Sequence, residues 1–382
     1  MRSPVRRAAA AALLAGLACG CGHASAFRCP AEGGPPWVEV ESDHFTVKTD
    51  APPGAAERMA RELERLRMAQ LAAWDGRFDP PARLEVVVLR NQTELGELLD
   101  PGLRVPFQRV VGYYAGSARP RVVTGLFLDR DKPSLALPPF REQAVAQAEV
   151  AESEVLRHEL AHHLAGQVLL RQPPWLGEGL AGYLAAAKLG TWQGRPAAAV
   201  GLAGWEAWAG ERVPAATLLA WRPGEPGAHY YVSSWLLVHW LVHRRGAAFA
   251  AYQQRLARAE EPAAAWTAEF PDLDPADGAA MAMLDRELDA YLRAASYTPL
   301  RVMLPAVEPR LRRRPVPPPE VHALRAELFL TPLLPSRKSR PRVEEEIAAS
   351  LREDPSGLPL ALTLAEAGHR EKALDLGRAA AT

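Results

Sequence analysis

The chain has 382 residues, of which 48% are hydrophobic, so it is long enough for one large domain plus a smaller one, with an ample core. Its 45 Lys and Arg residues balance 45 Asp and Glu residues, which excludes a protein whose overall field attracts nucleic acid or an acidic membrane. Any partner must therefore be argued from local features.

Residues 1–26 have the pattern of an export signal. The start is basic, with Arg2, Arg6 and Arg7, and residues 8–18 form an apolar stretch. Residues 24–26 (Ala-Ser-Ala) offer a cleavage site flanked by small residues. A second interpretation is a lipoprotein leader acylated on Cys19 or Cys21, although neither has Leu three positions before it. We therefore expect an exported bacterial protein that is periplasmic, secreted or an outer-membrane lipoprotein. After cleavage at Ala26 only Cys29 would remain, which excludes an intramolecular disulfide framework.

The segment after the leader alternates strands and helices. Apolar alternation and β-branched runs predict strands at 37–41, 45–49, 84–89 and 122–128. Apolar residues at helical spacing predict helices at 55–74 and 93–99. This order of elements is typical of an α+β domain.

A predicted helix at 144–170 carries the sequence RHELAHH at 157–163. Residues four apart share a helix face, so His158 and His162 can direct two imidazoles at one point, with Glu159 beside them. Catalytic zinc takes three protein ligands and leaves a fourth position for water, whose pKa falls toward neutrality. The pattern predicts a zinc site with its own general base.

Glu178 is the candidate for the third ligand. Pro173 and Pro174 end the first helix, and a second helix can begin near Trp175, so a helical hairpin would bring Glu178 back to the histidines. With ten His residues in the chain, a random H-E-x-x-H is expected only about 0.02 times. The alternatives are a helix whose polar residues merely face water and a metal site without catalysis.

The run HELAH at 158–162, followed by W-L-x-E-G-x-A-x-Y at 175–183, resembles the gluzincin branch of zinc metallopeptidases. It is most similar to the bacterial peptidase MA-like proteins, over residues 37–295. The resemblance implies a zincin-like lobe, in which a small mixed sheet packs on an active-site helix, followed by a mostly helical lobe. It also implies that His158, His162 and Glu178 bind one Zn²⁺ and that Glu159 is the catalytic base.

In zincins of this kind, a strand along the cleft pairs with an extended substrate through backbone hydrogen bonds. Residues 122–128 are our candidate for that strand; the alternative is an ordinary buried strand. The stretch 192–221, rich in Ala, Gly and Trp, has weak periodicity and is interpreted as a loosely packed loop.

A strongly apolar helix is predicted at 229–242, and it begins with HYYVSSW. Peptide hydrolysis needs a donor for the developing oxyanion, and a phenol at a helix start can supply it. The resemblance to the family's Y-x-x-S-W arrangement favours Tyr231 as this catalytic residue, with Tyr230 and His229 as substitutes. The alternative is a tyrosine that only packs.

Two further histidines on this helix, His239 and His243, are a rival metal pair. They lack a neighbouring glutamate, because Trp240 follows His239, and the surrounding Leu and Val residues favour amphipathic packing. His163 lies off the ligand face of its own helix, where such a residue supports the ligands or is exposed.

After a helix at 274–292, the chain becomes rich in Pro and Arg at 299–319, which is the composition of a linker. Three short helices are predicted at 343–351, 358–367 and 370–380, and they are similar to tetratricopeptide helical pairs. Such repeats need about three units to stand alone. The tail therefore either packs on the catalytic domain or forms an incomplete partner-binding platform.

The predicted organisation is a leader at 1–26, a zincin-like metallopeptidase domain at 27–298, a linker at 299–319 and a helical tetratricopeptide-like tail at 320–382. The predicted function is an exported zinc peptidase in which Glu159 activates water. The expected partners are a peptide or protein substrate and a protein bound by the tail, without nucleic acid, and with membrane contact only through a lipid anchor. The alternative is a non-catalytic, metal-containing envelope adaptor that binds partners through the tail.

Overall fold

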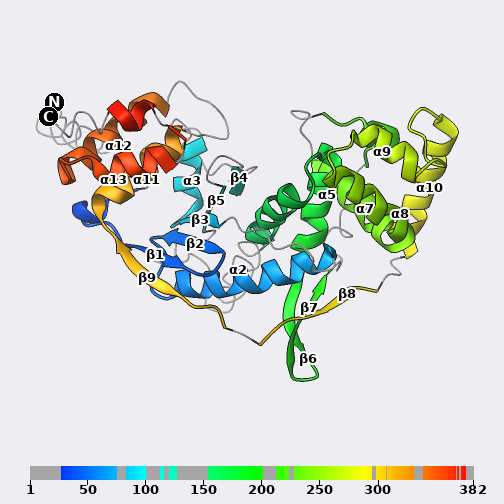
Figure 1. Ribbon diagram of the computed structural model, residues 1–382, viewed down its shortest axis with the longest axis horizontal. Helices are drawn as coiled ribbons and strands as arrows, with labels where there is room; N and C mark the ends of the chain where they lie inside the picture. The colour runs from blue at the N-terminus through cyan, green and yellow to red at the C-terminus, as the bar shows by residue number, and fades with distance from the viewer. Residues whose placement is uncertain are drawn as a thin grey trace, which may run out of the picture.

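The computed structural model describes residues 27–74, 83–99, 112–115, 120–126, 154–200, 212–222, 228–294, 298–306, 308–330, 339–366, 368–369 and 371–375. Over these ranges the chain is a mixed α+β protein, with a six-stranded sheet at one end, a helical lobe at the other and a three-stranded sheet below (Figure 1). Among the helices of these ranges, none has both the length and the apolar character needed to cross a bilayer.

The larger sheet is mixed. Its strands are β1 (Trp37–Glu41), β2 (Phe45–Thr49), β3 (Leu84–Leu89), β4 (Gly112–Ala115), β5 (Arg121–Gly125) and β9 (Arg312–Val316). They lie in the order β4-β5-β3-β2-β1-β9, and the two inner pairs β2–β3 and β3–β5 are parallel. β1 and β2 form the antiparallel hairpin that the alternating pattern predicted.

The strand predicted at 122–128 is β5, and residues 127–128 lie outside the described residues. β5 is hydrogen-bonded to β3 on one side and to β4 on the other, so it has no free edge to offer a substrate. The prediction that this strand pairs with substrate is therefore wrong. On this side of the described sheet the edge strand is β4, which was not predicted from the sequence.

Helices cover one face of this sheet and build its main core. α2 (Ala55–Leu71) lies across the face and continues as a short 3-10 turn, η2 (Ala72–Trp74), and residues 154–168 form a second helix beside it. The shared core contains Val47, Val86, Val88 and Val122 of the sheet, Leu63 and Leu66 of α2, and Leu156, Leu160 and Leu164. The part of the predicted helix at 144–153 lies outside the described residues.

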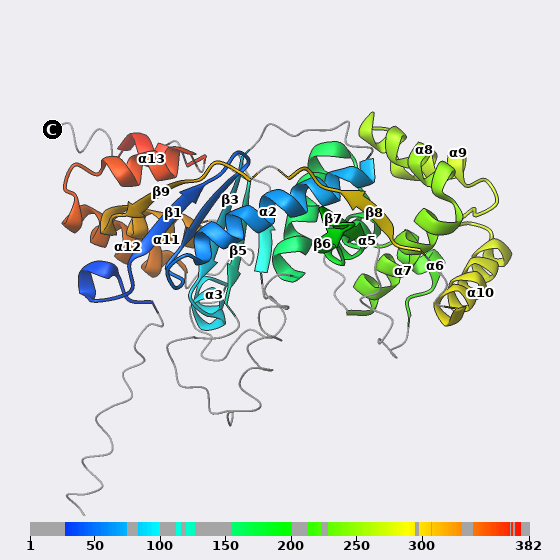
Figure 2. The same ribbon diagram turned by 90° about the horizontal axis from the view of Figure 1, so that it is seen from below.

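The C-terminal helices cover the opposite face (Figures 1 and 2). α3 (Gln92–Leu99), α11 (Pro318–Leu330) and α12 (Ser339–Glu353) share a core with the sheet, and α13 (Leu358–Glu366) packs on α11 and α12. Residues 371–375 are also helical. Of the two arrangements left open for the tail, packing on the body of the protein is the one observed.

The interpretation of residues 299–319 as a linker is corrected by the strand pairing. β8 (Leu300–Met303) pairs with β7 of the second sheet, and β9 pairs along its length with β1. Pro315 is tolerated because β9 is an edge strand, where a missing N–H can face away from the sheet. The stretch therefore ties both sheets to the body of the protein.

The helical lobe contains α5 (Pro174–Ala185), α6 (Ala215–Leu219), α7 (Ala228–Arg244), α8 (Gly246–Ala257), α9 (Pro262–Glu269) and α10 (Gly278–Ala294). Its core is rich in aromatic residues: Trp175 stacks on Tyr252, and both contact Trp266 edge-on. The helices predicted at 229–242 and 274–292 are α7 and α10.

The second sheet is antiparallel, with β6 (Lys188–Trp192), β7 (Arg195–Val200) and β8. β6 and β7 form a hairpin whose two turn residues, Gln193 and Gly194, both have positive φ, as a type I′ turn requires. Because β7 and α6 lie within 192–221, the interpretation of that stretch as a loose loop is wrong where the structure describes it. Near the start of the chain, η1 (Pro30–Glu32) is a single 3-10 turn.

Candidate metal centre

The helix at 154–168 is held between the two main cores. Leu156, Leu160 and Leu164 pack against the sheet and α2. Ala161 and Ala165 pack into the core of the helical lobe. Since both cores fix the same helix, its orientation and that of the two motif histidines are set from two sides.

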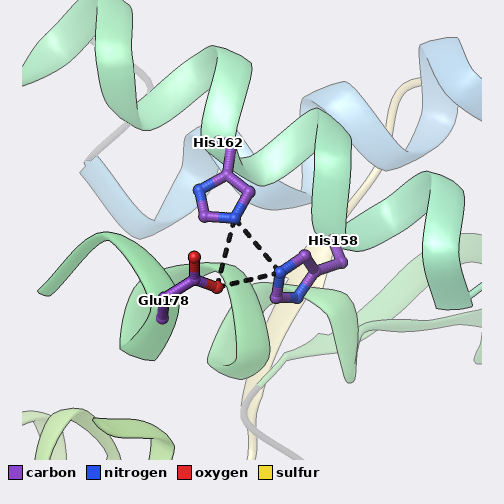
Figure 3. A group of neighbouring side chains, drawn as sticks. All are labelled: His158, His162 and Glu178. Atoms are coloured by element: carbon purple, nitrogen blue, oxygen red, sulfur yellow. Dashed lines mark hydrogen bonds and ion pairs between the residues drawn. The ribbon is translucent and has the colours of Figure 1, made fainter. Parts of the chain in front are cut away.

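α5 begins where the sequence predicted. Pro173 is extended, Pro174 occupies the first helical turn, and the backbone N–H of Leu176 donates to the Pro173 carbonyl. The side chain of Trp175 anchors this turn in the aromatic core. One turn later, Glu178 projects toward the helix at 154–168 (Figure 3).

The structure brings the three predicted ligands together (Figure 3). The Nε2 atoms of His158 and His162 are 3.1 Å apart, and Glu178 Oε2 is 3.2 Å from the first and 3.4 Å from the second. Tetrahedral zinc with ligand distances of about 2.0–2.1 Å places neighbouring donor atoms about 3.3 Å apart. The donor triangle therefore has the size of one face of a zinc tetrahedron.

This triangle is the one group of three potential metal ligands found within the described ranges. Its side chains are 22%, 22% and 21% exposed, so water and a substrate can reach the donor atoms. Two imidazoles and one carboxylate are also a donor set that zinc favours. The residues fit a zinc ion in both geometry and chemistry.

The charges in this cluster affect the pKa values of His162 and Glu178. Burial by itself raises the pKa of Glu178, but hydrogen bonds from His158 and His162 outweigh it and lower the pKa to about 2. Burial lowers the pKa of His162, and the hydrogen bond and negative charge of Glu178 reverse this, for a net increase. The carboxylate thus stabilises positive charge at the point where the donors converge.

Glu159 lies beside the ligands and is half-buried. Desolvation raises the pKa of its carboxyl group, the positive charges of His158 and His162 oppose the rise, and the pKa remains raised. A hydrogen-bonding interaction with the backbone of Tyr114 also opposes the rise in this pKa. Edge strand β4 therefore holds the predicted base in place.

A second contact fixes β4 against the same helix. The hydroxyl of Tyr114 lies 3.3 Å from His163 Nδ1, and a Cβ at Gly112 would lie only 2.6 Å from the Val155 side chain. Burial and the nearby Arg67 lower the pKa of His163 to about 4, so its ring is neutral at pH 7. His163 is a supporting residue, as its position off the ligand face suggested.

Tyr114 was not predicted from the sequence as a residue of this site. A four-residue strand carries too little alternation to be recognised, and residues on both sides of it lie outside the described ranges. The one available signal was the pair of aromatic residues in GYYA, which is compatible with a strand.

Tyr231 lies in the first turn of α7 and is 39% exposed. Burial raises the pKa of its hydroxyl, and the carboxylates of Glu178 and Glu159 raise it further, so the phenol lies within electrostatic reach of the centre. Tyr230 packs on Trp221 beside the helical core, and His229 is exposed. The carboxylates of Glu178 and Glu159 therefore act on the Tyr231 hydroxyl.

The rival pair on α7 belongs to the core. His239 is fully buried and its Nδ1 lies 2.7 Å from the Tyr291 hydroxyl, while its ring is 4.5 Å from that of His243. No third metal-binding side chain joins them in the part of the chain that the structure describes. These contacts fit the interpretation that His239 and His243 pack in the helical core and do not bind a metal.

Gly179 sets how closely α5 can approach α7. A Cβ at this position would lie 2.5 Å from the Ser234 carbonyl oxygen and 2.5 Å from the Val238 side chain. We expect Gly179→Ala to lower the free energy of unfolding by about 1–3 kcal/mol and to weaken zinc binding, because α5 must shift and Glu178 shifts with it. Urea unfolding and zinc titration measure the two effects.

Gly177→Ala is the matched control, because its added Cβ would meet only a Gln172 side-chain oxygen at 3.5 Å. That variant should unfold at the same or higher urea concentration, since Ala is the better helix former. Equal behaviour of the two variants would contradict the close-approach explanation.

No protein-family model matches this sequence, and no curated protein matches it either, so the donor triangle and its surroundings are the basis for assigning a function.

Proposed function

We propose that this protein is an exported, zinc-dependent peptidase of the gluzincin type. The observation that supports it most directly is the triangle of His158, His162 and Glu178 donor atoms, 3.1–3.4 Å apart, with Glu159 beside it. Glu159 has no use as a ligand in this arrangement, because three donors already converge without it. A metal centre with an adjacent carboxylate is suited to hydrolysis.

The fold is compatible with this proposal. The helix at 154–168 lies against one face of a mixed sheet, edge strand β4 contacts that helix, and a helical lobe supplies the third ligand. This is the arrangement expected of a zincin-like lobe followed by a helical lobe. We propose that β4, rather than β5, is the strand that pairs with an extended substrate, because among the described strands it is the edge strand nearest the centre.

The reaction divides among a few residues. Zinc, when bound, supplies a Lewis acid that polarises a carbonyl group and makes water a nucleophile near neutral pH. His158, His162 and Glu178 hold the ion. Glu159 takes the proton from the attacking water and returns it to the leaving amine. The backbone of Tyr114 keeps the Glu159 carboxylate aimed at that position.

Tyr231 is proposed as the hydrogen-bond donor to the oxyanion that develops at the carbonyl. Its hydroxyl has no hydrogen-bond partner among the described residues, and it lies near both carboxylates. Tyr231→Phe is expected to lower kcat about 10²-fold with little change in KM, because the donor acts only in the transition state. Steady-state kinetics test this, with Tyr230→Phe as the control; a tenfold rise in KM at constant kcat would assign Tyr231 to substrate binding instead.

The proposed function as a whole is tested by metal removal. The purified chain is incubated with a mixture of peptides, and the products are identified by mass spectrometry. We expect cleavage that a zinc chelator abolishes and that stoichiometric zinc restores. Cleavage that survives complete zinc removal would contradict the proposal.

One observation favours the adaptor alternative. Leu358 and Leu362, one turn apart on α13, and Leu374 are 59%, 55% and 58% exposed, as residues of a partner-binding surface would be. The peptide experiment separates the two functions. A zinc-loaded chain that cleaves no peptide in a broad mixture would favour the adaptor.

A further inference from the structure

The second sheet has an inner and an outer face, which its register defines. Residues directly opposite each other in an antiparallel pair point to the same face, and successive residues point to opposite faces. Leu189, Ala198 and Val302 occupy one face by this rule, and they pack on Met68 and Ala69 of α2. The other face therefore points away from α2.

The same register fixes what lies on the outer face. Its cationic residues are Lys188, Arg195 and Arg301, its large apolar residues are Trp192 and Met303, and its small residues are Gly190, Ala197 and Ala199. All three cations are exposed, and Trp192 and Met303 are 42% and 44% exposed. The guanidinium carbon of Arg301 lies 3.3 Å from the centre of the Trp192 ring. Basic residues and a large aromatic residue thus lie together on this face.

Within the described residues, no carboxylate pairs with the basic residues of this face. No Asp or Glu occurs in β6, β7 or β8, and none of Lys188, Arg195 and Arg301 has a carboxylate partner among the described residues. By contrast, Arg61 and Arg65 of α2 both bind Glu308. The chain as a whole has equal numbers of basic and acidic residues, so the excess of basic residues on this face is a local feature.

We propose that the outer face of this sheet docks on an anionic phospholipid bilayer. Tryptophan prefers the boundary between headgroups and acyl chains, and Lys and Arg are attracted to anionic headgroups. The small residues Gly190, Ala197 and Ala199 add no large side chains to this face, and the exposed groups on it are the basic residues, Trp192 and Met303. The β6–β7 hairpin also projects from the body of the protein, so a planar surface can reach it (Figure 1).

This docking does not depend on zinc or on the proposed peptidase activity. It differs from the lipid anchor expected from the leader, because it uses folded residues far along the chain. Docking would hold the protein at a membrane surface whether or not the leader is removed.

Vesicle co-sedimentation of the full chain tests the proposal, using phosphatidylcholine vesicles with and without about 30% phosphatidylglycerol, an anionic phospholipid. The wild type should bind the anionic vesicles more tightly. The double variant Arg195→Glu/Arg301→Glu should bind them at least about 30-fold more weakly, since each basic residue near the surface contributes about 1 kcal/mol. Trp192→Ala should weaken binding as well.

The control is Arg286→Glu/Arg293→Glu, which changes the net charge equally at two exposed positions of α10. Because the leader is present in every variant, its own affinity for lipid cancels in the comparison. Equal losses in the two double variants, or no preference for anionic vesicles, would overturn the proposal. Binding to an acidic peptide such as polyglutamate, without binding to vesicles, would instead identify an acidic protein as the partner and overturn it too.

Discussion

Replacing Glu159 by Gln is expected to lower kcat by about 10³-fold or more while the zinc content stays unchanged. Glutamine has nearly the same shape and its amide oxygen can still accept the hydrogen bond from the Tyr114 backbone, but it cannot take a proton from water. The three donor atoms of the proposed metal site are untouched by this change. Kinetics and metal analysis on the same preparation measure both quantities.

Glu154→Gln is the matched control, because Glu154 is an exposed residue of the same helix. It should leave kcat and zinc content as they are. A Glu159→Gln protein that retains activity within about threefold of the wild type would show that Glu159 is not the base, since a lost general base costs far more.

The largest expected effect on stability is at Arg121. This arginine is buried at the end of β5 facing the C-terminal helices, where it contacts Glu85 at 2.5 Å and also binds Glu327 of α11. The two carboxylates raise its pKa despite burial. Arg121→Met would leave the buried carboxylate of Glu327 without the guanidinium, while Glu85 keeps its ion pair with Lys48, at a cost of about 3–5 kcal/mol in the free energy of unfolding.

Chemical denaturation measures this loss, and Arg340→Met serves as the control. Arg340 forms an ion pair with Glu344 on the surface of α12, where both side chains are largely exposed, so its removal should leave the unfolding midpoint unchanged. A loss below about 1 kcal/mol for Arg121→Met would mean that this contact between sheet and tail contributes little.

The cluster of candidate metal ligands could be predicted because the information is local. The spacing of His158 and His162 follows from the helix period, and the two prolines before Trp175 define where the next helix begins, so Glu178 could be placed opposite them. Each step depends on residues within about one helical hairpin. The strands β1, β2 and β3 were predictable for the same reason, since alternation and β-branched runs are local signals.

What could not be predicted depends on distant pairing. β9 is rich in Arg and Pro, and only its pairing with β1, near the other end of the chain, makes it a strand. Arg314 of β9 forms an ion pair with Glu39 of β1, which favours this pairing. The role of Tyr114 likewise appears only when β4 meets the helix that carries Glu159. Local composition predicts none of these contacts, because each one joins residues far apart in the sequence.

The central claim is that His158, His162 and Glu178 hold zinc, and metal analysis by mass spectrometry of the purified chain tests it most directly. The wild type should contain about one zinc per chain, Glu178→Ala should lose it, and His243→Ala, in the rival pair, should keep it. A folded wild type without zinc would contradict the metal centre. Zinc retained in Glu178→Ala but lost in His243→Ala would place the metal on α7 instead.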